Sequence, residues 1–384
     1  MNRLYESIGE SIFARMSALA ARHGAVNLGQ GFPDFGWPDE ILQAAARALT
    51  EKSNQYAPAR GLPELREAIA AHYTRHQGLD LGADHVCVTS GGTEALGACI
   101  LAVVEPGDEV IIFTPAYDSY APMIRRAGGI VREVALTPPG WRIEAEALRA
   151  AVTARTRAII VNNPHNPAAR LFSSDELEIA AAVAREHDLV VISDEVWEHV
   201  ILDGQGFTPL ASLPGMAERT FKVGSAGKIF SLTGWKVGWI VAAPQLAALA
   251  AKAHQFLTFA TAPNLQWAVS YGLNEGDNWI EPMKARFARA RDRMMDKLKA
   301  AGFAVLPVDA TYFLSVDLAA SGIMMTDRDF ADMAVERAGV AVVPLSVFAE
   351  QDPPRHLVRL CFGKKDETID AGVGAMAKAK ELAR

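Results

Sequence analysis

Cysteine is scarce in this sequence. Its 384 residues include only three cysteines, Cys87, Cys99 and Cys361. Each lies inside an apolar run and none belongs to a CxxC pair, a usage typical of core thiols in the reducing cytoplasm. We therefore expect a cytoplasmic protein with neither disulfides nor a metal site.

A secretory leader, a membrane span and a dense basic tract are also missing. The first residues, MNRLYESIGESIFARMS, carry charges in every turn and lack the apolar region of a signal peptide. The most apolar long segment, residues 239–257, is rich in alanine and interrupted by Pro244, Lys252 and His254. With 38 Lys and Arg against 45 Asp and Glu, the net charge is −7. We expect neither a membrane nor a nucleic acid as a partner.

The middle of the chain has the pattern of an α/β protein. Short runs that are apolar on both faces and rich in β-branched residues occur at residues 109–113, 157–161, 189–193 and 237–241. Helical patterns separate them, and one of these, SSDELEIAAAVAREH, is predicted to begin with Ser174 as its cap. Strands of this kind are typical of a mostly parallel sheet covered by helices on both faces.

The length of 384 residues allows two or three domains. Residues 1–45 are predicted to form an extended N-terminal arm that joins the smaller domain, because LGQGFPDFGWPDE is rich in Gly, Pro and Asp. Residues 46–285 are predicted to form the large domain. From about residue 280 a long charged helix is followed by shorter strand patterns, so residues 286–384 are predicted to form a smaller α/β domain.

Lys228 lies in the stretch SAGKIFSLTGWKVGW, in a turn of small residues after the strand-like run TFKV. A nucleotide-binding P-loop would need glycine at position 222 and serine or threonine at position 229, where this chain has Lys222 and Ile229. The run from Ser225 to Lys228 fits the S-x-x-K motif of penicillin-binding enzymes, but no KTG follows and SDE precedes it. A third interpretation is a lysine that forms a Schiff base with pyridoxal phosphate.

That cofactor needs a carboxylate at its pyridine nitrogen and a residue that stacks on its ring. Asp194 follows the apolar run LVVIS, at the strand end where ligands bind in α/β sheets, and a buried acid there needs a positive partner. Tyr117 follows the run EVIIF and is placed to stack on the ring. Asn166 follows the run RAIIV and is placed to donate to the ring oxygen, with neighbouring prolines that favour cis peptides.

The cofactor also needs a phosphate site. The segment HVCVTSGGTEALGA indicates a strand, a glycine-rich turn and a helix, and backbone N–H groups at a helix N-terminus bind phosphate. The residues expected at this helix start are Gly91, Gly92 and Thr93. Ser225 and Lys236 are expected to add a hydroxyl and a positive charge.

Arg359 stands among apolar residues in HLVRLCF, so its guanidinium must meet an anion. The carboxylate of an amino acid suits its planar fork. Each of these residues alone also has an ordinary explanation: a solvated loop lysine, a helix cap, a turn, a core aromatic such as Tyr117 or Phe259, or an internal ion pair. Their coincidence at successive strand ends favours the cofactor, because one ligand then explains all of them.

At these residues the chain resembles the class I/II pyridoxal-phosphate aminotransferases of fold type I over nearly its full length. The motifs that carry the resemblance are LGQGFPDF, QYAPARGLPELREAIA, SGGTEAL, TPAYDSYAP, NNPHNP, SDEVWEH, SAGKIFSLTGWKVGW and HLVRLCFGK. LGQGFPDF, HQFLTFATAP and PLSVF with RLCF are most similar to the kynurenine/methionine-type subgroup, which acts on bulky apolar or aromatic amino acids. The resemblance implies a mostly parallel seven-stranded sheet between helices, a smaller α/β domain and a homodimer.

The resemblance also implies a role for each candidate. Lys228 would form the Schiff base and move a proton between the substrate Cα and the cofactor. The other cofactor contacts would come from Asp194, Asn166, Tyr117, Gly91, Gly92, Thr93, Ser225 and Lys236. Arg359 and the backbone of Gly31 would bind the substrate carboxylate. Tyr56 would reach the phosphate of the neighbouring subunit, and Phe259 would line its substrate pocket.

Three positions depart from the family pattern. Trp197 stands where relatives usually carry a tyrosine that donates to the ring oxygen, and its indole offers an N–H in a different place. Ala169 ends an Asn-Pro-x-Gly pattern, which matters if that position needs a positive φ. Lys236 stands where many relatives carry arginine, so it gives a point charge instead of a fork.

The predicted activity is amino transfer from an L-amino acid of methionine, aromatic, kynurenine or glutamine type to a 2-oxo acid, with ping-pong kinetics. Three alternatives stay open. The same cofactor permits β-elimination from cysteine conjugates. A non-catalytic, aminotransferase-like sensor belongs to another class, although the basic helix-turn-helix region of such regulators has no room here. The last alternative is an acyl-transferase with Ser225 as its nucleophile.

Overall fold

The computed structural model describes residues 1–275 and 278–383 of the chain. Its largest sheet has seven strands in the order β2-β8-β7-β6-β5-β3-β4. These strands are β2 (Val86–Thr89), β3 (Glu109–Thr114), β4 (Ile130–Ala135), β5 (Thr156–Asn162), β6 (Val190–Asp194), β7 (Thr220–Ser225) and β8 (Gly238–Val241). Within this sheet β8 pairs antiparallel with both neighbours and the other pairs are parallel. The predicted mostly parallel seven-stranded sheet is therefore confirmed.

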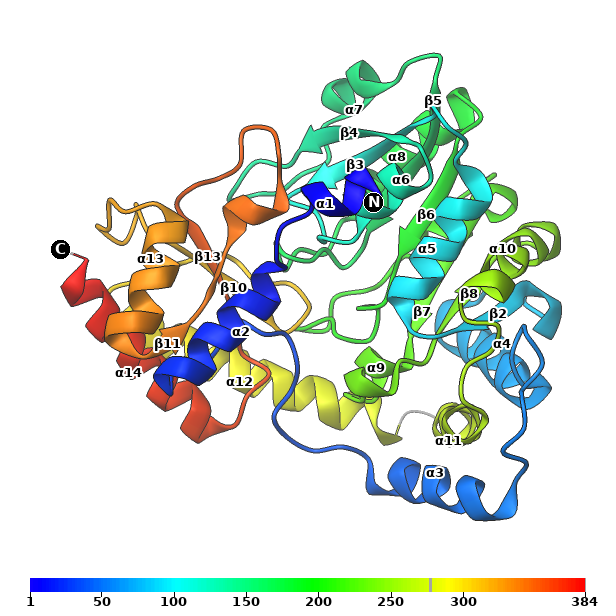
Figure 1. Cartoon of the computed structure of the whole chain (residues 1–384), viewed down its shortest axis with the longest axis horizontal. Helices are drawn as coiled ribbons and strands as arrows, with labels where there is room; N and C mark the ends of the chain where they lie inside the picture. The colour runs from blue at the N-terminus through cyan, green and yellow to red at the C-terminus, as the bar shows by residue number, and fades with distance from the viewer. Residues whose placement is uncertain (276–277, 384) are drawn as a thin grey trace.

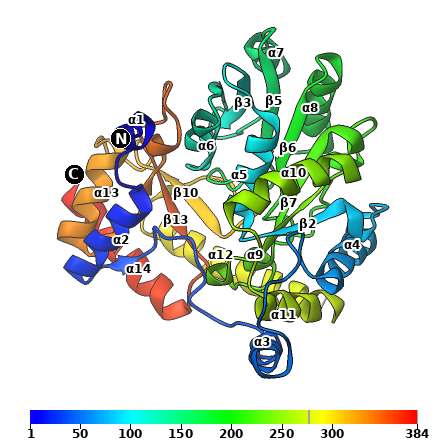
Figure 2. The same ribbon diagram turned by 45° about the vertical axis from the view of Figure 1, so that its right-hand side comes forward.

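Helices cover both faces of this sheet (Figures 1 and 2). Successive strand residues point to opposite faces, so Ile111 and Ile159 join one hydrophobic cluster while Ile112 and Ile160 join another. The first cluster includes side chains of α7 (Ala145–Ala151) and α8 (Ser174–Glu186), and the second includes side chains of α5 (Gly92–Val103) and α10 (Pro244–Leu257). Burial on both faces explains why the central residues of β3 and β5 are apolar.

Three more helices pack around the β2–β8 end of the sheet. They are α3 (Asp39–Glu51), α4 (Pro63–Gln77) and α11 (Pro263–Asn274), and their apolar side chains share one cluster with residues of β2 and β8. In Figure 1, α3 lies beside α11 at the lower edge of the molecule.

The C-terminal part of the chain builds a second, smaller sheet with strands in the order β12-β13-β10-β9, all antiparallel. Its strands are β9 (Ala304–Val305), β10 (Phe313–Asp317), β12 (Val343–Pro344) and β13 (Leu357–Cys361). The long helix α12 (Ile280–Ala300), α13 (Asp327–Met333) and α14 (Asp366–Leu382) pack with it around a separate core. β1 (Val26–Asn27) pairs in parallel with β11 (Val340–Ala341), which ties the N-terminal segment to this part.

The N-terminal segment differs from the predicted extended arm. It contains α1 (Arg3–Ser7) and α2 (Ile12–His23), whereas residues 8–11 and 28–38 are largely without regular structure. α2 forms because Met16 and Ala20 lie one turn apart and bury one face of the helix against the smaller core. The glycine-rich motif LGQGFPDF thus describes the stretch after α2 and not the segment as a whole.

Two other predictions concern boundaries. The cap of α8 is Ser173, whose side chain accepts the N–H of Glu176, so the predicted cap at Ser174 was one residue too late. The predicted division at residues 45/46 and 285/286 stays a prediction, and both positions fall inside helices, α3 and α12.

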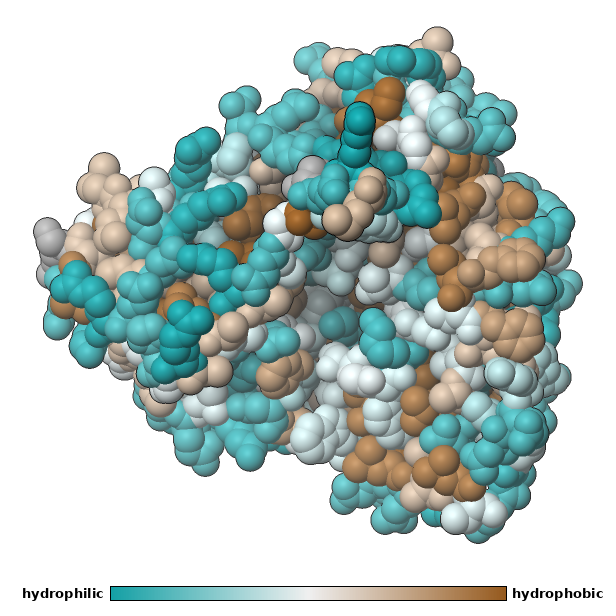
Figure 3. All heavy atoms as spheres, viewed as in Figure 1, coloured by the Kyte–Doolittle hydropathy of each residue, from teal (hydrophilic) through white to brown (hydrophobic). Residues whose placement is uncertain are grey.

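Among the described residues, no helix is both long and apolar enough to span a membrane. All three cysteines are buried and unpaired, as predicted. A hollow lies between the large sheet and the smaller part, near the centre of the face in Figure 3. The carboxyl ends of the parallel strands point toward this hollow, where the candidate site lies.

Candidate active site

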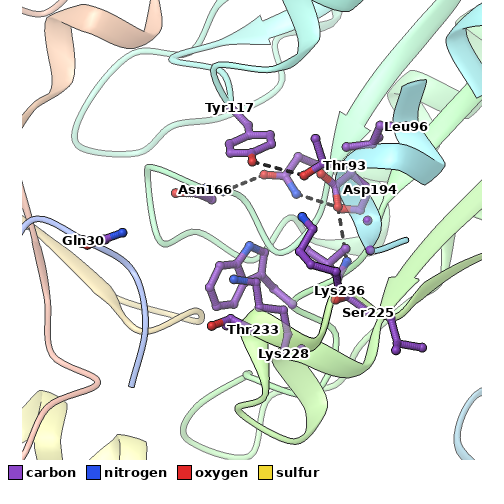
Figure 4. A pocket seen from close by; sticks show the side chains of 17 residues that line it. Gln30, Thr93, Leu96, Tyr117, Asn166, Asp194, Ser225, Lys228, Thr233 and Lys236 are labelled. Atoms are coloured by element: carbon purple, nitrogen blue, oxygen red, sulfur yellow. Dashed lines mark hydrogen bonds between the residues drawn. The ribbon is translucent and has the colours of Figure 1, made fainter. Parts of the chain in front are cut away.

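A cavity of about 400 Å³ lies at the carboxyl ends of β5, β6 and β7 (Figure 4). Its lining residues are Gln30, Gly91, Gly92, Thr93, Leu96, Tyr117, Asn162, Asn166, Asp194, Val196, Trp197, Ser225, Gly227, Lys228, Thr233, Lys236 and Val237. The chain thus gathers most of the predicted site residues in one place, although they come from segments far apart in the sequence.

Lys228 lies on α9 (Ala226–Ile229), a single turn that directly follows β7. Its Nζ donates a hydrogen bond to the hydroxyl of Tyr312 at 3.0 Å and lies 4.4 Å from the ring centre of Trp197. Burial disfavours the charged ammonium and lowers the pKa of Lys228 to about 8. A substantial fraction of this amine is therefore neutral at a pH near 8.

Asp194 ends β6 and is almost fully buried. Its Oδ2 accepts a hydrogen bond from the hydroxyl of Tyr120 at 2.6 Å, and its Oδ1 accepts the N–H of Val196 at 3.4 Å. Burial raises the pKa of Asp194 to about 6, although both hydrogen bonds act in the opposite direction. A cationic ring nitrogen would supply the positive partner that favours the carboxylate.

The predicted phosphate site has the geometry of an anion cradle. α5 begins at Gly92 after Gly91, which has a φ of +85°. A φ of this sign disfavours residues with a side chain, and a Cβ atom at Gly91 would lie 3.1 Å from Cε of Lys236. Lys236 itself has a left-handed φ of +55°, a conformation that is uncommon outside glycine and concentrates at functional sites.

Two further side chains border this cradle. The hydroxyl of Ser225 makes no cap hydrogen bond to α9, although Ser225 occupies the cap position. The hydroxyl of Thr93 lies 3.5 Å from that of Tyr117, which brings the start of α5 next to the ring expected to stack on the cofactor. Tyr117 packs edge-on against Tyr120 at 5.7 Å between ring centres.

Asn166 and Arg359 form a pair at the next strand end. Arg359 is 1% exposed, and its Nη1 donates to Oδ1 of Asn166 at 2.7 Å. Because arginine only donates, the oxygen of the Asn166 amide faces Arg359 and its NH₂ group is turned elsewhere. The backbone N–H of Asn166 is fixed by Oδ1 of Asn162 at 2.8 Å. The peptide bonds before Pro164 and Pro167 are both cis, as the sequence favoured.

Arg359 lies among aromatic rings, and Asp118 is near enough to act on it electrostatically without forming an ion pair among the described residues. Its guanidinium carbon lies 3.9 Å from the ring centre of Phe313, 5.3 Å from that of Phe13 and 5.4 Å from that of Phe348. Burial lowers its pKa to about 10, and its Nε has no hydrogen-bond partner. None of the ion pairs between described residues includes Arg359, so the internal ion pair considered from the sequence is not found. A buried cation with an unused donor fits a carboxylate ligand.

These residues fit pyridoxal phosphate. The cavity offers the Lys228 amine with a lowered pKa and a glycine cradle next to Lys236. It also offers the buried carboxylate of Asp194, which forms no ion pair among the described residues. These are the groups that the aldehyde, the ring nitrogen and the phosphate of this cofactor require.

Besides Arg359, three predicted residues lie outside this cavity lining. Gly31 is adjacent to it: its carbonyl accepts the Tyr312 hydroxyl at 2.8 Å, and a Cβ atom there would lie 2.5 Å from Cζ of Phe313. Tyr56 and Phe259 lie together on the surface, edge-on at 5.4 Å, with 86% and 41% of their area exposed. In the single chain they do not reach the Lys228 cavity.

The departures from the family pattern have visible structural correlates. Trp197 is buried under Lys228 and packs edge-on against Tyr312 at 4.5 Å. Ala169 has a φ of +58°, so this position does adopt the conformation that favours glycine. Its carbonyl accepts the N–H groups of Asp309 and Ala310, which holds the strained residue in place.

Sequence reasoning missed three residues. Tyr120 and Asn162 stand in motifs that were already singled out, TPAYDSYAP and NNPHNP, but nothing in the sequence says that they bond to Asp194 and Asn166. Tyr312 stands at the start of an ordinary apolar strand pattern and carries no signal at all. Its contact with Lys228 exists only in the folded chain.

Comparisons with known proteins show the family of this chain. A profile of the family described as aminotransferase class I and II matches residues 24–376. The probable N-succinyldiaminopimelate aminotransferase DapC of Mycobacterium tuberculosis is 42% identical over 97% of this chain and 96% of its own. A solved structure of the N-succinyldiaminopimelate aminotransferase from that organism superposes with a TM-score of 0.95 over 99% of both chains.

Two further relatives belong to the types that the sequence motifs suggested. The methionine aminotransferase of Escherichia coli is 41% identical over 94% of each chain. Human kynurenine–oxoglutarate transaminase 1 is 33% identical over 96% of each chain. Since the family profile and these relatives cover nearly all of the sequence, the chain belongs to the class I and II aminotransferases and is a transaminase of fold type I that depends on pyridoxal phosphate.

Proposed function

We propose that this chain transfers the amino group of an L-amino acid of methionine, aromatic, kynurenine or glutamine type to a 2-oxo acid, with Lys228 as the nucleophile and base. The observation that carries the proposal is the Lys228 amine, with a pKa lowered to about 8, in one cavity with the buried carboxylate of Asp194. An amine with this pKa is sufficiently neutral near pH 8 to attack a carbonyl and to accept a proton.

Bound pyridoxal phosphate supplies an aldehyde that condenses with amines and a ring that withdraws electrons from the substrate Cα–H bond. Nζ of Lys228 accepts the Cα proton in one direction and returns it in the other. Asp194 remains anionic when a positive ring nitrogen faces it, because that charge opposes the effect of burial on its pKa. The same two residues therefore serve both half-reactions.

Arg359 is assigned to the substrate carboxylate. Its unused Nε and its pairing with Asn166 support this role, because the guanidinium is already oriented and still has a donor to offer. The NH₂ group of Asn166, turned away from Arg359, is assigned to the ring oxygen of the cofactor. Gly31 is assigned to the same substrate carboxylate through its backbone.

The phosphate of the cofactor is assigned to the N-terminus of α5 and the groups around it. Gly91, Gly92 and Thr93 offer backbone N–H groups there, and Ser225 and Lys236 add a hydroxyl and a charge. Tyr117 is assigned to the face of the ring. Trp197 supplies an aromatic surface under Lys228 at 4.4 Å in place of the phenol that relatives carry.

Two substrate classes compete. The aromatic rings of Phe13, Phe313 and Phe348 around Arg359 support an amino acid with an apolar or aromatic side chain. The 42% identity to a probable N-succinyldiaminopimelate aminotransferase supports a long, anionic side chain as the second candidate. Measured kcat/KM values for methionine, phenylalanine, kynurenine, glutamine, aspartate and N-succinyldiaminopimelate decide between them. A preference for aspartate would contradict both.

Borohydride reduction of the loaded protein, followed by peptide mapping, tests the assignment of Lys228. We expect the reduced cofactor on Lys228 in the native protein and no stoichiometric label in the Lys228→Arg variant. A label on Lys236 or on another lysine would contradict the proposal. The β-lyase alternative predicts release of pyruvate and ammonia from cysteine conjugates in the absence of a 2-oxo acid, whereas transamination needs that acceptor.

A homodimer with shared sites is the second part of the proposal. Tyr56 and Phe259 are assigned to the neighbouring subunit's site because they pack on each other, remain largely exposed and lie outside the Lys228 cavity of their own chain. The family resemblance of the stretch QYAPARG supports this assignment.

A further inference from the structure

We propose that Tyr312 is a positioning residue for transamination: its hydroxyl holds the free amine of Lys228 and ties this amine to the backbone of Gly31. The inference rests on the proposed function, because it concerns the lysine that we assign as nucleophile and base. It is carried by the hydrogen bonds of the Tyr312 hydroxyl, by the number of protons available in them, and by the packing of the Tyr312 ring.

The hydroxyl of Tyr312 lies between two groups that are remote in the sequence. It accepts a hydrogen bond from Nζ of Lys228 at 3.0 Å and donates one to the carbonyl of Gly31 at 2.8 Å. Tyr312 itself is 1% exposed, so water does not compete for these bonds at its ring. One oxygen atom thus links the short helix α9 to the segment between β1 and α3.

Counting protons fixes the direction of each bond. A phenol has one proton, and the carbonyl of Gly31 has none, so Tyr312 must donate to Gly31. Toward Lys228 the phenol is left with only its lone pairs, and it can only accept. A neutral Lys228 amine therefore turns one N–H toward Tyr312. The lone pair of the Lys228 nitrogen then points away from Tyr312. A charged amine gains more from the same contact, because hydrogen bonds to ionised donors are stronger.

Aromatic packing holds the phenol in place. The Tyr312 ring meets Trp197 edge-on at 4.5 Å and lies 5.7 Å from Phe287 and 4.9 Å from Phe313. Lys228 Nζ lies over the Trp197 ring at 4.4 Å and 5.4 Å from the centre of the Tyr312 ring. Among the described residues, the amine therefore has an aromatic surface on one side and the Tyr312 oxygen as its hydrogen-bond acceptor.

The other end of the link is equally constrained. A Cβ atom at Gly31 would come within 2.5 Å of the Phe313 ring, so the Gly31 backbone lies directly against the residue that follows Tyr312. Gly31 is assigned to the substrate carboxylate, and Lys228 is assigned to its Cα proton. The Tyr312 hydroxyl thus connects the two places where the substrate is held and deprotonated.

Tyr312→Phe tests the inference, because it removes the hydroxyl and keeps the ring. We measure the pH dependence of acetylation of Lys228 by trace acetic anhydride in the cofactor-free protein, quantified from the Lys228 peptide by mass spectrometry. Loss of one acceptor for the charged amine lowers the midpoint by about one pH unit. The control Tyr271→Phe removes the hydroxyl of a tyrosine on α11, which does not line the Lys228 cavity, and leaves the Lys228 midpoint unchanged.

A second readout uses the loaded enzyme. Tyr312→Phe is expected to lower kcat for a good amino donor about tenfold with less than about a threefold change in KM, because the base is displaced while Arg359 is intact. If the variant does not fold, 3-fluorotyrosine at position 312 replaces it; its poorer acceptor oxygen shifts the midpoint in the same direction by a smaller amount.

An unchanged or raised Lys228 midpoint in the folded Tyr312→Phe variant overturns the inference. This result is separate from the failure of the proposed function, which would appear as a reduced cofactor on a residue other than Lys228. The acetylation experiment needs no cofactor, so it gives its answer in either case.

Discussion

The charge of Asp194 depends on Tyr120, a residue to which the sequence alone assigns no role. The Tyr120 hydroxyl donates to Oδ2 of Asp194 at 2.6 Å, and this bond opposes the effect of burial, which raises the pKa of Asp194 to about 6. A carboxylate with this pKa stays charged above pH 6 and becomes neutral below it. The pairing with a cationic ring nitrogen is therefore sensitive to anything that moves this pKa.

Tyr120→Phe is expected to raise the pKa of Asp194 further and to weaken retention of pyridoxal phosphate about tenfold near pH 7, since a hydrogen bond to a charged group is lost. The loss should shrink at a higher pH, where Asp194 is ionised in the variant as well. Absorbance titrations with the cofactor measure the affinity of both proteins for pyridoxal phosphate between about pH 6 and pH 9. Tyr271→Phe, on α11, is the matched control. A loss of cofactor affinity in Tyr120→Phe that is the same at every pH would contradict the explanation.

At the scale of helices and strands, a buried ion cluster joins α4, β6, β7 and the turn after β6. Nζ of Lys222 on β7 bonds to Glu195 and, at 2.5 Å, to Glu198, and the hydroxyl of Tyr73 on α4 donates to Glu198 at 2.7 Å. Burial alone would lower the pKa of Lys222. The two carboxylates have the larger effect, so the pKa of Lys222 is raised. Glu195 follows Asp194 directly, so this cluster anchors the strand end that carries the site.

Lys222→Met is expected to lower the free energy of unfolding by about 3–5 kcal/mol, because two buried carboxylates lose their cation. Denaturant unfolding of the cofactor-free protein measures the change. In the double variant with Glu195→Gln part of the loss should be recovered. Lys284→Met removes an exposed i,i+3 pair with Glu281 and should cost less than about 1 kcal/mol. A Lys222→Met protein as stable as the native one would contradict this account.

A second contact between elements joins α10 to the phosphate cradle. Nδ1 of His254 lies 2.6 Å from Glu94 in the first turn of α5, and Nε2 lies 2.8 Å from the carbonyl of Ala59. Glu94 also accepts the N–H of Ser90 at 2.6 Å. Both acceptors favour a doubly protonated ring: burial lowers the pKa of His254, but these partners outweigh it and the pKa is raised.

His254 makes the stability of the fold depend on pH. Because the pKa of His254 is higher in the folded chain than its ordinary 6.5, its contribution is complete below pH 6.5 and is lost as pH rises through the folded value. The native protein should lose about 1 kcal/mol of unfolding free energy relative to His254→Gln between about pH 6 and pH 9. Denaturant unfolding at several pH values measures the difference. His23→Gln, at the exposed end of α2, is the control, and a difference independent of pH would refute the assignment.

At the scale of the whole molecule, several large apolar side chains are exposed. Leu101 of α5, Phe256 and Leu257 of α10, and the Tyr56–Phe259 pair expose between 41% and 86% of their area. Figure 3 shows hydrophobic residues on the face over α5 and α10. Exposed apolar surface of this kind is typical of an interface between chains, which supports the proposed homodimer.

Shared sites predict complementation. Lys228→Ala and Tyr56→Ala are each expected to be nearly inactive, and their mixture after subunit exchange should regain about a quarter of the native activity, because half of the dimers are mixed and each mixed dimer has one intact site. Adding Phe256→Glu to both chains should abolish this recovery, whereas Met324→Glu, an equally exposed residue of the smaller part, should not. No recovery in the unmodified mixture would contradict shared sites.

Most of the fold and of the candidate site could be predicted from the sequence. Apolar runs mark strands buried on both faces, and parallel strands bring their carboxyl ends to one edge, so the strand pattern alone is sufficient to place Asp194 and Asn166 together. Predictions failed where the outcome depends on packing or on one residue of register: the extended arm contains α2, and the cap of α8 is Ser173.

The sequence by itself determined the strand ends, the glycine turn and the lysine, because each is a local pattern of residue types along one segment. Only the tertiary structure decided that Tyr120 bonds to Asp194, that Tyr312 bonds to Lys228 and Gly31, and that Arg359 lies among phenylalanines. The physical reason is that a hydrogen bond requires two groups within about 3 Å in a suitable orientation. Residues far apart in the chain meet that condition only after the cores around them have packed.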